Sequence, residues 1–145
     1  MIVTLTEAEV ADVVALIAAA GLSRQQNDTG ADLRLALASP SSTVLVARDG
    51  ADLTGCVMTG CDGHRGWVYY LAVAEAARGK GLGRALLHHA EAWCAAQGVA
   101  RLNLMVRAEN IAAADFYAQL GYRTSDVVVL QRDLTSGSDV RGSHR

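Results

Sequence analysis

Apolar and polar positions change their spacing along this chain, and each change predicts a different kind of element. Val10, Val13, Val14 and Ile17 recur at intervals of three and four residues, which is the spacing of a helix with one buried face. Residues 67–74 (WVYYLAVA) are almost continuously apolar or aromatic, as is typical of a strand in the centre of a sheet. The chain therefore combines helices with buried strands.

Residues that start or stop elements mark the boundaries. Thr6-Glu7-Ala8-Glu9 has the form of a capping box, and Gly21 ends the helix that follows it. Pro40 stops a second helix. The predicted helices are Thr6 to the stop at Gly21, Thr29–Ala38, Gly81–Gln97 and Asn110–Leu120. The predicted strands are residues 2–5, 43–48, 52–60, 67–74, 101–107 and 122–133. The last of these strands is centred on Val127–Leu130.

The order of these elements, β-α-α-β-β-β-α-β-α-β, predicts one α/β domain whose sheet has mixed strand directions. A turn at Asp49-Gly50 joins two strands into a hairpin, and a second turn covers residues 61–66. The 145 residues suit a single domain, which we place at 1–133. Residues 134–145 are rich in Ser and Gly and lack an apolar pattern, so we expect a disordered tail.

Composition narrows the class of partner. The chain is 51% hydrophobic and 19% charged, with a formal net charge of -2, which favours neither nucleic acid nor an anionic membrane. No secretory leader or membrane-spanning run is apparent. The cysteines, Cys56, Cys61 and Cys94, are odd in number and are best explained as reduced thiols. We expect a cytoplasmic protein.

One Cys/His grouping invites a test for zinc. Cys56, Cys61 and His64 lie close together in sequence but lack a clear fourth ligand. His88 and His89 lie on the long predicted helix without a partner four residues on. Structural cysteines in a strand are the commoner case, so we predict no metal.

The most informative segment is the glycine turn, Arg78-Gly79-Lys80-Gly81-Leu82-Gly83-Arg84, which joins the buried strand to the long helix. The first amides of a helix lack internal partners and carry partial positive charge. Glycines allow close approach of a ligand, and Arg78, Lys80 and Arg84 add full charges. The alternative is a glycine turn with a purely structural role, but three glycines interleaved with cations favour a phosphate or pyrophosphate site.

Two common nucleotide motifs do not fit this turn. A P-loop requires G-x-x-x-x-G-K-[ST], which is absent from the chain. The dinucleotide fingerprint G-x-G-x-x-G would need a third glycine where Arg84 stands.

The chain does resemble a known family, the GNAT N-acetyltransferases. Arg78-x-x-Gly81-x-Gly83 is similar to its [RQ]-x-x-G-x-[GA] motif, and the segment from Asn110 through Phe116-Tyr117 to Gly121-Tyr122 is similar to its second motif. The resemblance covers residues 1–133 and includes the element order. The segments Asp62–Gly66 and Tyr69–Leu71, with Asn27-Asp28, look like its YpeA-type bacterial branch.

The resemblance implies a single-domain GNAT fold, with a mixed, mostly antiparallel central sheet flanked by helices, and acetyl-CoA as cosubstrate. The turn amides would hold the coenzyme A pyrophosphate, and the exposed backbone of residues 71–73 would pair with the pantetheine arm and bind the acetyl oxygen. Asn110 would hydrogen-bond the same arm. The residues implied for the cosubstrate are Leu71, Ala72, Val73, Arg78, Gly79, Lys80, Gly81, Gly83, Arg84 and Asn110.

The resemblance also implies that Tyr117 lies near the thioester sulfur. A phenol is protonated at neutral pH and could donate its proton to the departing thiolate, which would make Tyr117 the catalytic general acid. Alternatively, Phe116-Tyr117 could simply pack the helix onto the sheet. Asn110 likewise has a simpler role as a helix N-cap, and this role is compatible with ligand binding.

The general base is not evident from the sequence. Several side chains could take the proton of the attacking amine, although each could equally be a turn or surface group; they are Asp28, Asp62, His64, Tyr70 and Glu75. Ordered water is the alternative. The branch that acetylates a ribosomal N-terminus resembles L-E-V-R where this chain has Leu104-Met105-Val106-Arg107, so Met105 argues against that substrate.

The acceptor pocket would be lined by residues 22–28 and 61–66. Carboxylates there would suit an amine cation, whereas Arg24 or Arg65 would suit an acidic group on an amino-acid-like substrate. The predicted substrate residues are Asn27, Asp28, Asp62, His64, Arg65 and Trp67. We predict acetylation of a primary amine on a small molecule by a monomer or homodimer. The alternatives are a protein or peptide N-acetyltransferase, a non-catalytic acyl-CoA-binding domain, and a different acyl donor.

Overall fold

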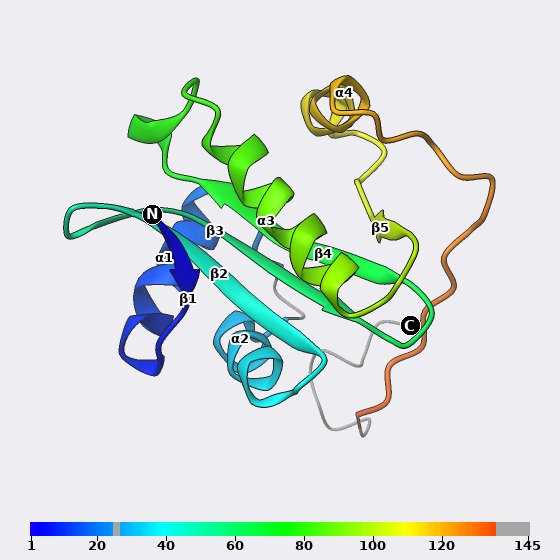
Figure 1. Ribbon diagram of the computed structural model, residues 1–145, viewed down its shortest axis with the longest axis horizontal. Coiled ribbons are helices and arrows are strands. Elements are labelled where there is room, and N and C mark those ends of the chain that lie inside the picture. The colour runs from blue at the N-terminus through cyan, green and yellow to red at the C-terminus, as the bar shows by residue number, and fades with distance from the viewer. Residues whose placement is uncertain (25–26, 136–145) are drawn as a thin grey trace. The chain divides into compact units, whose positions relative to one another are not determined.

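The computed structural model describes residues 1–24 and 27–135, which fall into two compact units (Figure 1). The first unit comprises Met1–Arg24 and Asp28–Met105. The second contains Asn27 and the described residues from Val106 onward. The sheet and most of the helices belong to the first unit.

The first unit is built on a five-stranded sheet in the order β1-β2-β3-β4-β5. Neighbouring strands run antiparallel from β1 to β4, whereas β4 and β5 are parallel. A parallel neighbour requires a crossover, and helix α3 supplies it. The strands are β1 (Ile2–Thr4), β2 (Ser42–Asp49), β3 (Asp52–Cys61), β4 (Gly66–Val73) and β5 (Leu102–Leu104).

Helices cover both faces of this sheet. The helical elements of the first unit are η1 (Glu7–Glu9), α1 (Val10–Ala19), α2 (Thr29–Ala38), η2 (Glu75–Ala77) and α3 (Leu82–Ala96). On one face, Val13 and Ile17 of α1 and Leu33 of α2 form a buried core with apolar side chains of β2 and β3. Burial of such side chains is the main favourable term in folding.

The opposite face of the sheet packs against α3 at very short range. A Cβ atom added at Gly55 would lie 2.8 Å from Cδ1 of Leu86, and one added at Gly66 would lie 2.8 Å from Sγ of Cys94. Real side chains do not approach so closely, so glycine at these positions allows α3 to lie directly on β3 and β4. This contact places the start of α3 next to the end of β4.

Strand β4 contains a bulge that changes which face its side chains occupy. Tyr69 lies opposite Met58 and Ala72 opposite Cys56, so two residues of β4 face the single residue between them on β3. Tyr70 takes up the extra residue with a positive φ of 54°. As a result Tyr70 lies on the α2 side of the sheet, where its hydroxyl donates to Oδ2 of Asp32 over 2.9 Å.

Most of the predicted elements are confirmed. Helix α2 has the predicted bounds, and β2, β3 and β4 agree with prediction to within one residue at each end. The carboxylate of Glu9 accepts a hydrogen bond from the amide of Thr6 over 3.3 Å, as the capping box requires. The first turn of the helix predicted from Thr6 differs from the prediction, because Glu7–Glu9 form a 3₁₀ turn rather than an α-helical one.

The last predicted strand, at residues 122–133, is wrong for this structure. No strand occurs between residues 122 and 135, and the apolar side chains at its centre are exposed, Val128 at 83% and Leu130 at 90%. A strand exists only when a neighbour satisfies its backbone groups, and no described residue pairs with this segment. The strand predicted at 101–107 is shorter than expected for the same reason, since only Leu102–Leu104 pair with β4. Most of the predicted tail, residues 136–145, lies outside the described residues.

Candidate functional site

The glycine turn leads from η2 into α3 and has the backbone conformation that its sequence demands. Gly79 and Gly81 have φ values of 79° and 80°, in the left-handed region that side chains with a Cβ rarely adopt. A Cβ added at either position would meet no atom within 4 Å. These glycines are therefore required by backbone conformation, and the space around them is open.

The start of α3 suits an anion. Gly81 is the N-cap of this 15-residue helix and contributes no side-chain cap, so the first amides of the helix have no capping partner from it. Arg78, Lys80 and Arg84 are all exposed around the turn. The guanidinium of Arg78 is held by a hydrogen bond from Nε to the carbonyl oxygen of Val73 over 3.2 Å. Backbone donors and cations thus converge at one helix end.

A stretch of β4 next to this turn has no neighbouring strand on its β5 side. Parallel pairing with β5 involves only Gly66–Val68, so Leu71–Val73 lie beyond the last paired residue. On the other side, β3 pairs with Ala72 and Val73. Within the described part of the chain, this is a sheet edge that an extended ligand could join by backbone hydrogen bonds.

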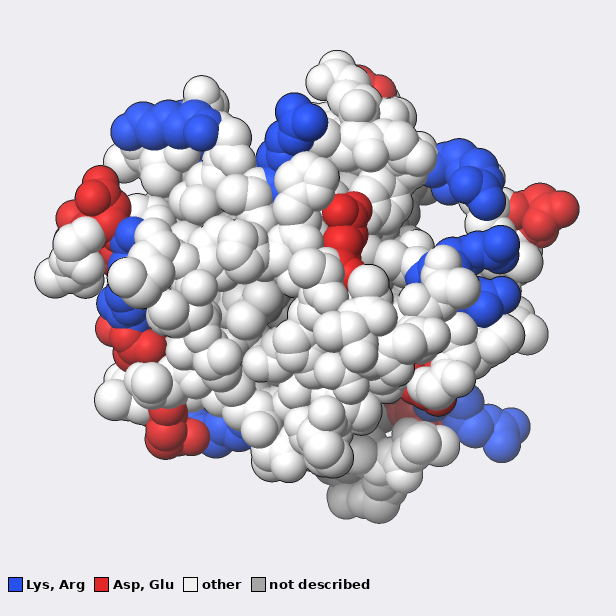
Figure 2. All heavy atoms as spheres, viewed as in Figure 1, with Lys and Arg blue, Asp and Glu red and all other residues white. Residues whose placement is uncertain are grey.

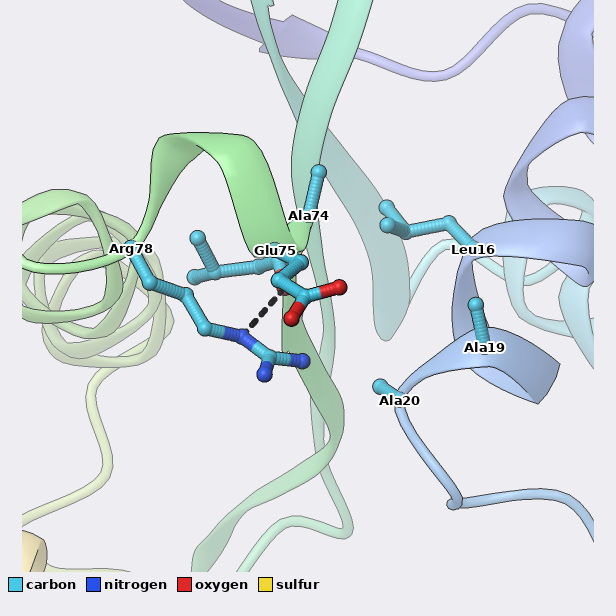
Figure 3. A pocket seen from close by; sticks show the side chains of 7 residues that line it. Leu16, Ala19, Ala20, Ala74, Glu75 and Arg78 are labelled. Atoms are coloured by element: carbon cyan, nitrogen blue, oxygen red, sulfur yellow. Dashed lines mark hydrogen bonds between the residues drawn. The ribbon is translucent and has the colours of Figure 1, made fainter.

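A pocket of about 300 Å³ lies where the end of β4 faces α1 (Figure 3). Arg78 and Glu75 supply its polar groups, and the side of α1 is apolar (Figure 3). The lining residues are Leu16, Ala19, Ala20, Val73, Ala74, Glu75 and Arg78. The pocket therefore shares Val73 and Arg78 with the residues predicted to bind the cosubstrate.

Asn110 and Tyr117 belong to the second unit, on helix α4 (Ile111–Gln119). Oδ1 of Asn110 accepts a hydrogen bond from the amide of Ala113 over 3.1 Å, so the N-cap role is confirmed. Tyr117 packs edge-on against Phe116 and Tyr122, at centroid distances of 5.1 and 5.7 Å. Burial raises the pKa of the Tyr117 phenol, so this side chain keeps its proton at neutral pH.

The predicted substrate residues of the first unit all have structural hydrogen bonds. Asp28 is the N-cap of α2 and accepts from the amide of Ala31 over 3.0 Å, while Arg24 donates to the carbonyl oxygens of Gly21 and Ser23. Asp62 orders the turn between β3 and β4, because Oδ1 accepts from the amides of His64 and Arg65 over 2.8 Å each. Asn27 lies in the second unit.

Trp67 extends this turn into a polar and aromatic surface. Its indole Nε1 donates to Oδ2 of Asp62 over 3.2 Å, and its ring is nearly parallel to that of Tyr69, with centroids 6.4 Å apart. Hydrogen bonds from the amides of Arg65 and His64 and from this indole lower the pKa of Asp62. Its carboxylate is therefore ionised at neutral pH.

The sequence analysis did not identify Tyr69 and Asp32 as site residues. Residues 67–74 read as a fully buried strand, yet Tyr69 is 41% exposed. The sequence carries no local signal for its exposure, because successive rings of a regular strand lie on opposite faces and only the bulge brings Tyr69 and Tyr70 to the same face. Asp32 carried no local signal, since its contact with Tyr70 spans 38 residues.

The cysteines behave as ordinary core groups. Cys56 and Cys94 are buried, and burial raises the pKa of the Cys56 thiol to about 12. Within residues 1–24 and 27–135, no cluster of three or more His, Cys, Asp or Glu side chains could hold a metal ion. Among the same residues, no helix is both long and apolar enough to cross a membrane. On the face seen in Figure 2, acidic and basic side chains both occur and neither sign forms a continuous patch.

Fold and turn together define a class of protein, an α/β sheet domain in which a glycine-rich helix start lies beside an unpaired strand edge. The sequence pattern of the acetyltransferase (GNAT) family matches residues 12–122, and the chain belongs to this family. An acetyltransferase of Yersinia pestis is 39% identical over 113 residues, which are 78% of this chain and 80% of that protein.

Solved structures have the same fold. A putative acetyltransferase from Agrobacterium tumefaciens superposes with a TM-score of 0.77 at 17% identity, over 92% of this chain and 99% of that one. The aminoglycoside N-acetyltransferase AAC(6')-Iy in complex with CoA superposes with a TM-score of 0.79 at 14% identity, over 93% and 95% of the two chains. At these identities the likeness concerns the fold. The predicted α/β fold and membership of the GNAT family are thereby confirmed.

Proposed function

We propose that this protein transfers the acetyl group of acetyl-CoA to a primary amine of a small molecule. The observation that carries the proposal is the glycine turn: two glycines at positive φ, an uncapped helix start and three exposed cations lie beside the unpaired edge of β4. Coenzyme A presents a diphosphate followed by an extended amide-containing arm. The two parts of this ligand match the two parts of the site in the same order.

In this proposal each group of the site has a separate task. The turn amides with Arg78, Lys80 and Arg84 bind the diphosphate, and the backbone of Leu71–Val73 pairs with the pantetheine arm. A backbone amide of this stretch stabilises the negative charge that develops on the acetyl oxygen. Asn110 donates to the arm through the amide nitrogen that its capping role does not use.

The reaction needs two proton transfers. The neutral amine attacks the acetyl carbonyl, the new C–N bond forms as the C–S bond breaks, and the sulfur leaves as a thiolate. Tyr117 gives its proton to this thiolate, which its raised pKa allows because the phenol is protonated at neutral pH. Water or one of the predicted basic side chains removes the proton from nitrogen.

Two observations support the choice of a small-molecule acceptor. Met105, which is 48% exposed, stands where the branch that acetylates a ribosomal N-terminus is expected to have a glutamate, so that particular protein substrate is disfavoured. The fold neighbour AAC(6')-Iy is described as an aminoglycoside N-acetyltransferase, so its acceptor is a small molecule. A peptide acceptor and a non-catalytic acyl-CoA-binding domain are the alternatives.

The first experiment is calorimetric titration of acetyl-CoA into the wild-type protein and Gly81→Glu. We expect micromolar binding by the wild type that is lost in the variant, followed by release of free thiol when small amines are screened. Acetylation of peptides but of no small amine would favour the protein acceptor, and binding without turnover would favour the non-catalytic alternative. A folded wild-type protein that does not bind acetyl-CoA would refute the proposal.

A further inference from the structure

The bulge in β4 places three aromatic rings on one face of the sheet. Gly66 faces α3, so alternation turns Trp67 and Tyr69 to the opposite face, and the extra residue turns Tyr70 to that face as well. Contact between Tyr70 and Asp32 of α2 agrees with this placement. The rings form an aromatic row, defined here as Trp67, Tyr69 and Tyr70.

A carboxylate lies at each end of the aromatic row. Asp62 accepts from the indole of Trp67 over 3.2 Å, and Asp32 accepts from the hydroxyl of Tyr70 over 2.9 Å. Asp62 is exposed, and the three hydrogen bonds it accepts leave part of its acceptor capacity unused. Arg65 directs its guanidinium to the carbonyl oxygen of His64 over 3.1 Å rather than to the carboxylate of Asp62.

This combination suits a cation. The faces of aromatic rings are negative, and an ammonium group within about 6 Å of a ring centroid is attracted to them. Tyr69 is 41% exposed and its ring is nearly parallel to that of Trp67, so aromatic surface of the row is accessible to a cation from solvent. An ionised carboxylate next to the same rings strengthens the preference for positive charge.

The cation bound here is not the reacting amine. An amine attacks only in its neutral form, whereas rings and carboxylates stabilise the ammonium form. The position of Tyr69 along β4 agrees with a bound cation that is separate from the reacting amine. Because the bulge takes up one residue, the stretch from Tyr69 to Val73 spans only three residues of β3, so at about 3.3 Å per residue Tyr69 lies within about 10 Å of the proposed acetyl site along the strand.

We propose that the acceptor carries a second, non-reacting cationic group, which binds the aromatic row beside Asp62 while a neutral amine up to about 10 Å away takes the acetyl group. The substrate class is therefore a diamine or polyamine-like molecule. This inference rests on the proposed acetyltransferase function and adds the requirement for a second charge.

The test compares linear diamines with monoamines of equal chain length, from about three to about seven methylene groups to match a span of up to about 10 Å. With acetyl-CoA at saturation, we expect kcat/KM to be about 5- to 30-fold higher for diamines, which corresponds to about 1–2 kcal/mol. Tyr69→Leu should lower the diamine value towards that of the monoamine, so that the ratio of the two kcat/KM values falls close to one. Tyr69→Phe keeps the ring and should retain most of the preference.

Leu35→Ala is the matched control. Leu35 is 73% exposed on α2, so this substitution should leave kcat/KM unchanged for both the diamine and the monoamine. Equal kcat/KM for the two amine classes in the wild type would overturn the inference, as would an equal loss for both classes in Tyr69→Leu. In either case acetylation itself would persist, so the proposed function would stand.

A second measurement does not depend on turnover. Hexane-1,6-diamine added to the coenzyme A complex should shift the indole N–H resonance of Trp67, assigned with Trp67→Phe, and leave that of Trp93 in place. An unshifted Trp67 resonance would overturn the inference. A wild-type protein that does not bind acetyl-CoA would refute the proposed function and this inference with it.

Discussion

Glycines at the two ends of α3 allow the anion site to be tested against a matched control. Gly81 precedes the helix and Gly98 follows it, with φ values of 80° and 93°, and a Cβ at either position would meet no atom within 4 Å. Replacement of either glycine by alanine should therefore lower the free energy of unfolding by about 1–2 kcal/mol through backbone strain alone. The two positions are separated by the 15-residue helix and Gln97, so they lie about 25 Å apart.

Glutamate adds a charge to the same strain. At Gly81 the carboxylate would lie about 6 Å from the two negative charges of a bound diphosphate, which gives about 1.4 kcal/mol of repulsion at the dielectric constant of water and about 5 kcal/mol at an effective value of 20. The expected loss of acetyl-CoA affinity is therefore at least about tenfold. At Gly98 the same charge is screened by distance and salt.

The assay pairs calorimetric titration of acetyl-CoA with urea unfolding of four variants, alanine and glutamate at each glycine. We expect both alanine variants and Gly98→Glu to bind within about threefold of the wild type, and Gly81→Glu alone to lose at least about tenfold. Raising the salt concentration should recover part of this loss. The reasoning is refuted if Gly98→Glu weakens binding as much as Gly81→Glu, or if Gly81→Glu binds like the wild type.

Three further predictions follow from individual side chains. Tyr117→Phe should lower kcat by about 100-fold or more with unchanged affinity for acetyl-CoA, because a general acid contributes to the chemical step. An unchanged kcat in a thiol-release assay would exclude this role. Burial raises the pKa of the Cys56 thiol in the folded protein from 9.0 to about 12, so the unfolded chain loses this proton at lower pH. The free energy of unfolding should therefore fall as the pH rises from 9 towards 12, by up to about 1.4 kcal/mol per pH unit. Chemical unfolding of Cys56→Ala should show a shallower decline over the same pH range. Gly66→Ala should destabilise the fold by about 1–3 kcal/mol, because its Cβ would lie 2.8 Å from Sγ of Cys94. In thermal melts, combining Gly66→Ala with Cys94→Ala should recover part of this loss. Equal destabilisation by Gly66→Ala in the wild type and in Cys94→Ala would count against this contact.

Elements with strong local signals were predictable from the sequence. The bounds of α2 follow from Asp28, which caps its first turn, and from Pro40, which prevents its continuation. The turn before α3 was equally predictable, since only glycine readily adopts the positive φ found at Gly79 and Gly81. In each case the deciding interactions lie within a few residues of one another.

The candidate acceptor surface was only partly predictable. Asp62 and Trp67 were singled out together with the other polar and aromatic residues in and next to the turn between β3 and β4. Tyr69 was not, because residues 67–74 were expected to form a buried central strand. The bulge at Tyr70 arises from pairing with β3, and such pairing depends on residues remote in sequence.

The sequence by itself determined the family motif, the glycine turn and the order of elements up to α4, because helix caps and positive-φ turns depend on adjacent residues. Only the tertiary structure decided which strands pair. In this structure residues 122–133 have no described strand partner, and pairing with β5 stops at Val68. Tyr70 lies on the α2 face of the sheet beside Asp32. The physical reason is that strand hydrogen bonds join segments far apart along the chain, so their register depends on how the whole sheet and its helices pack.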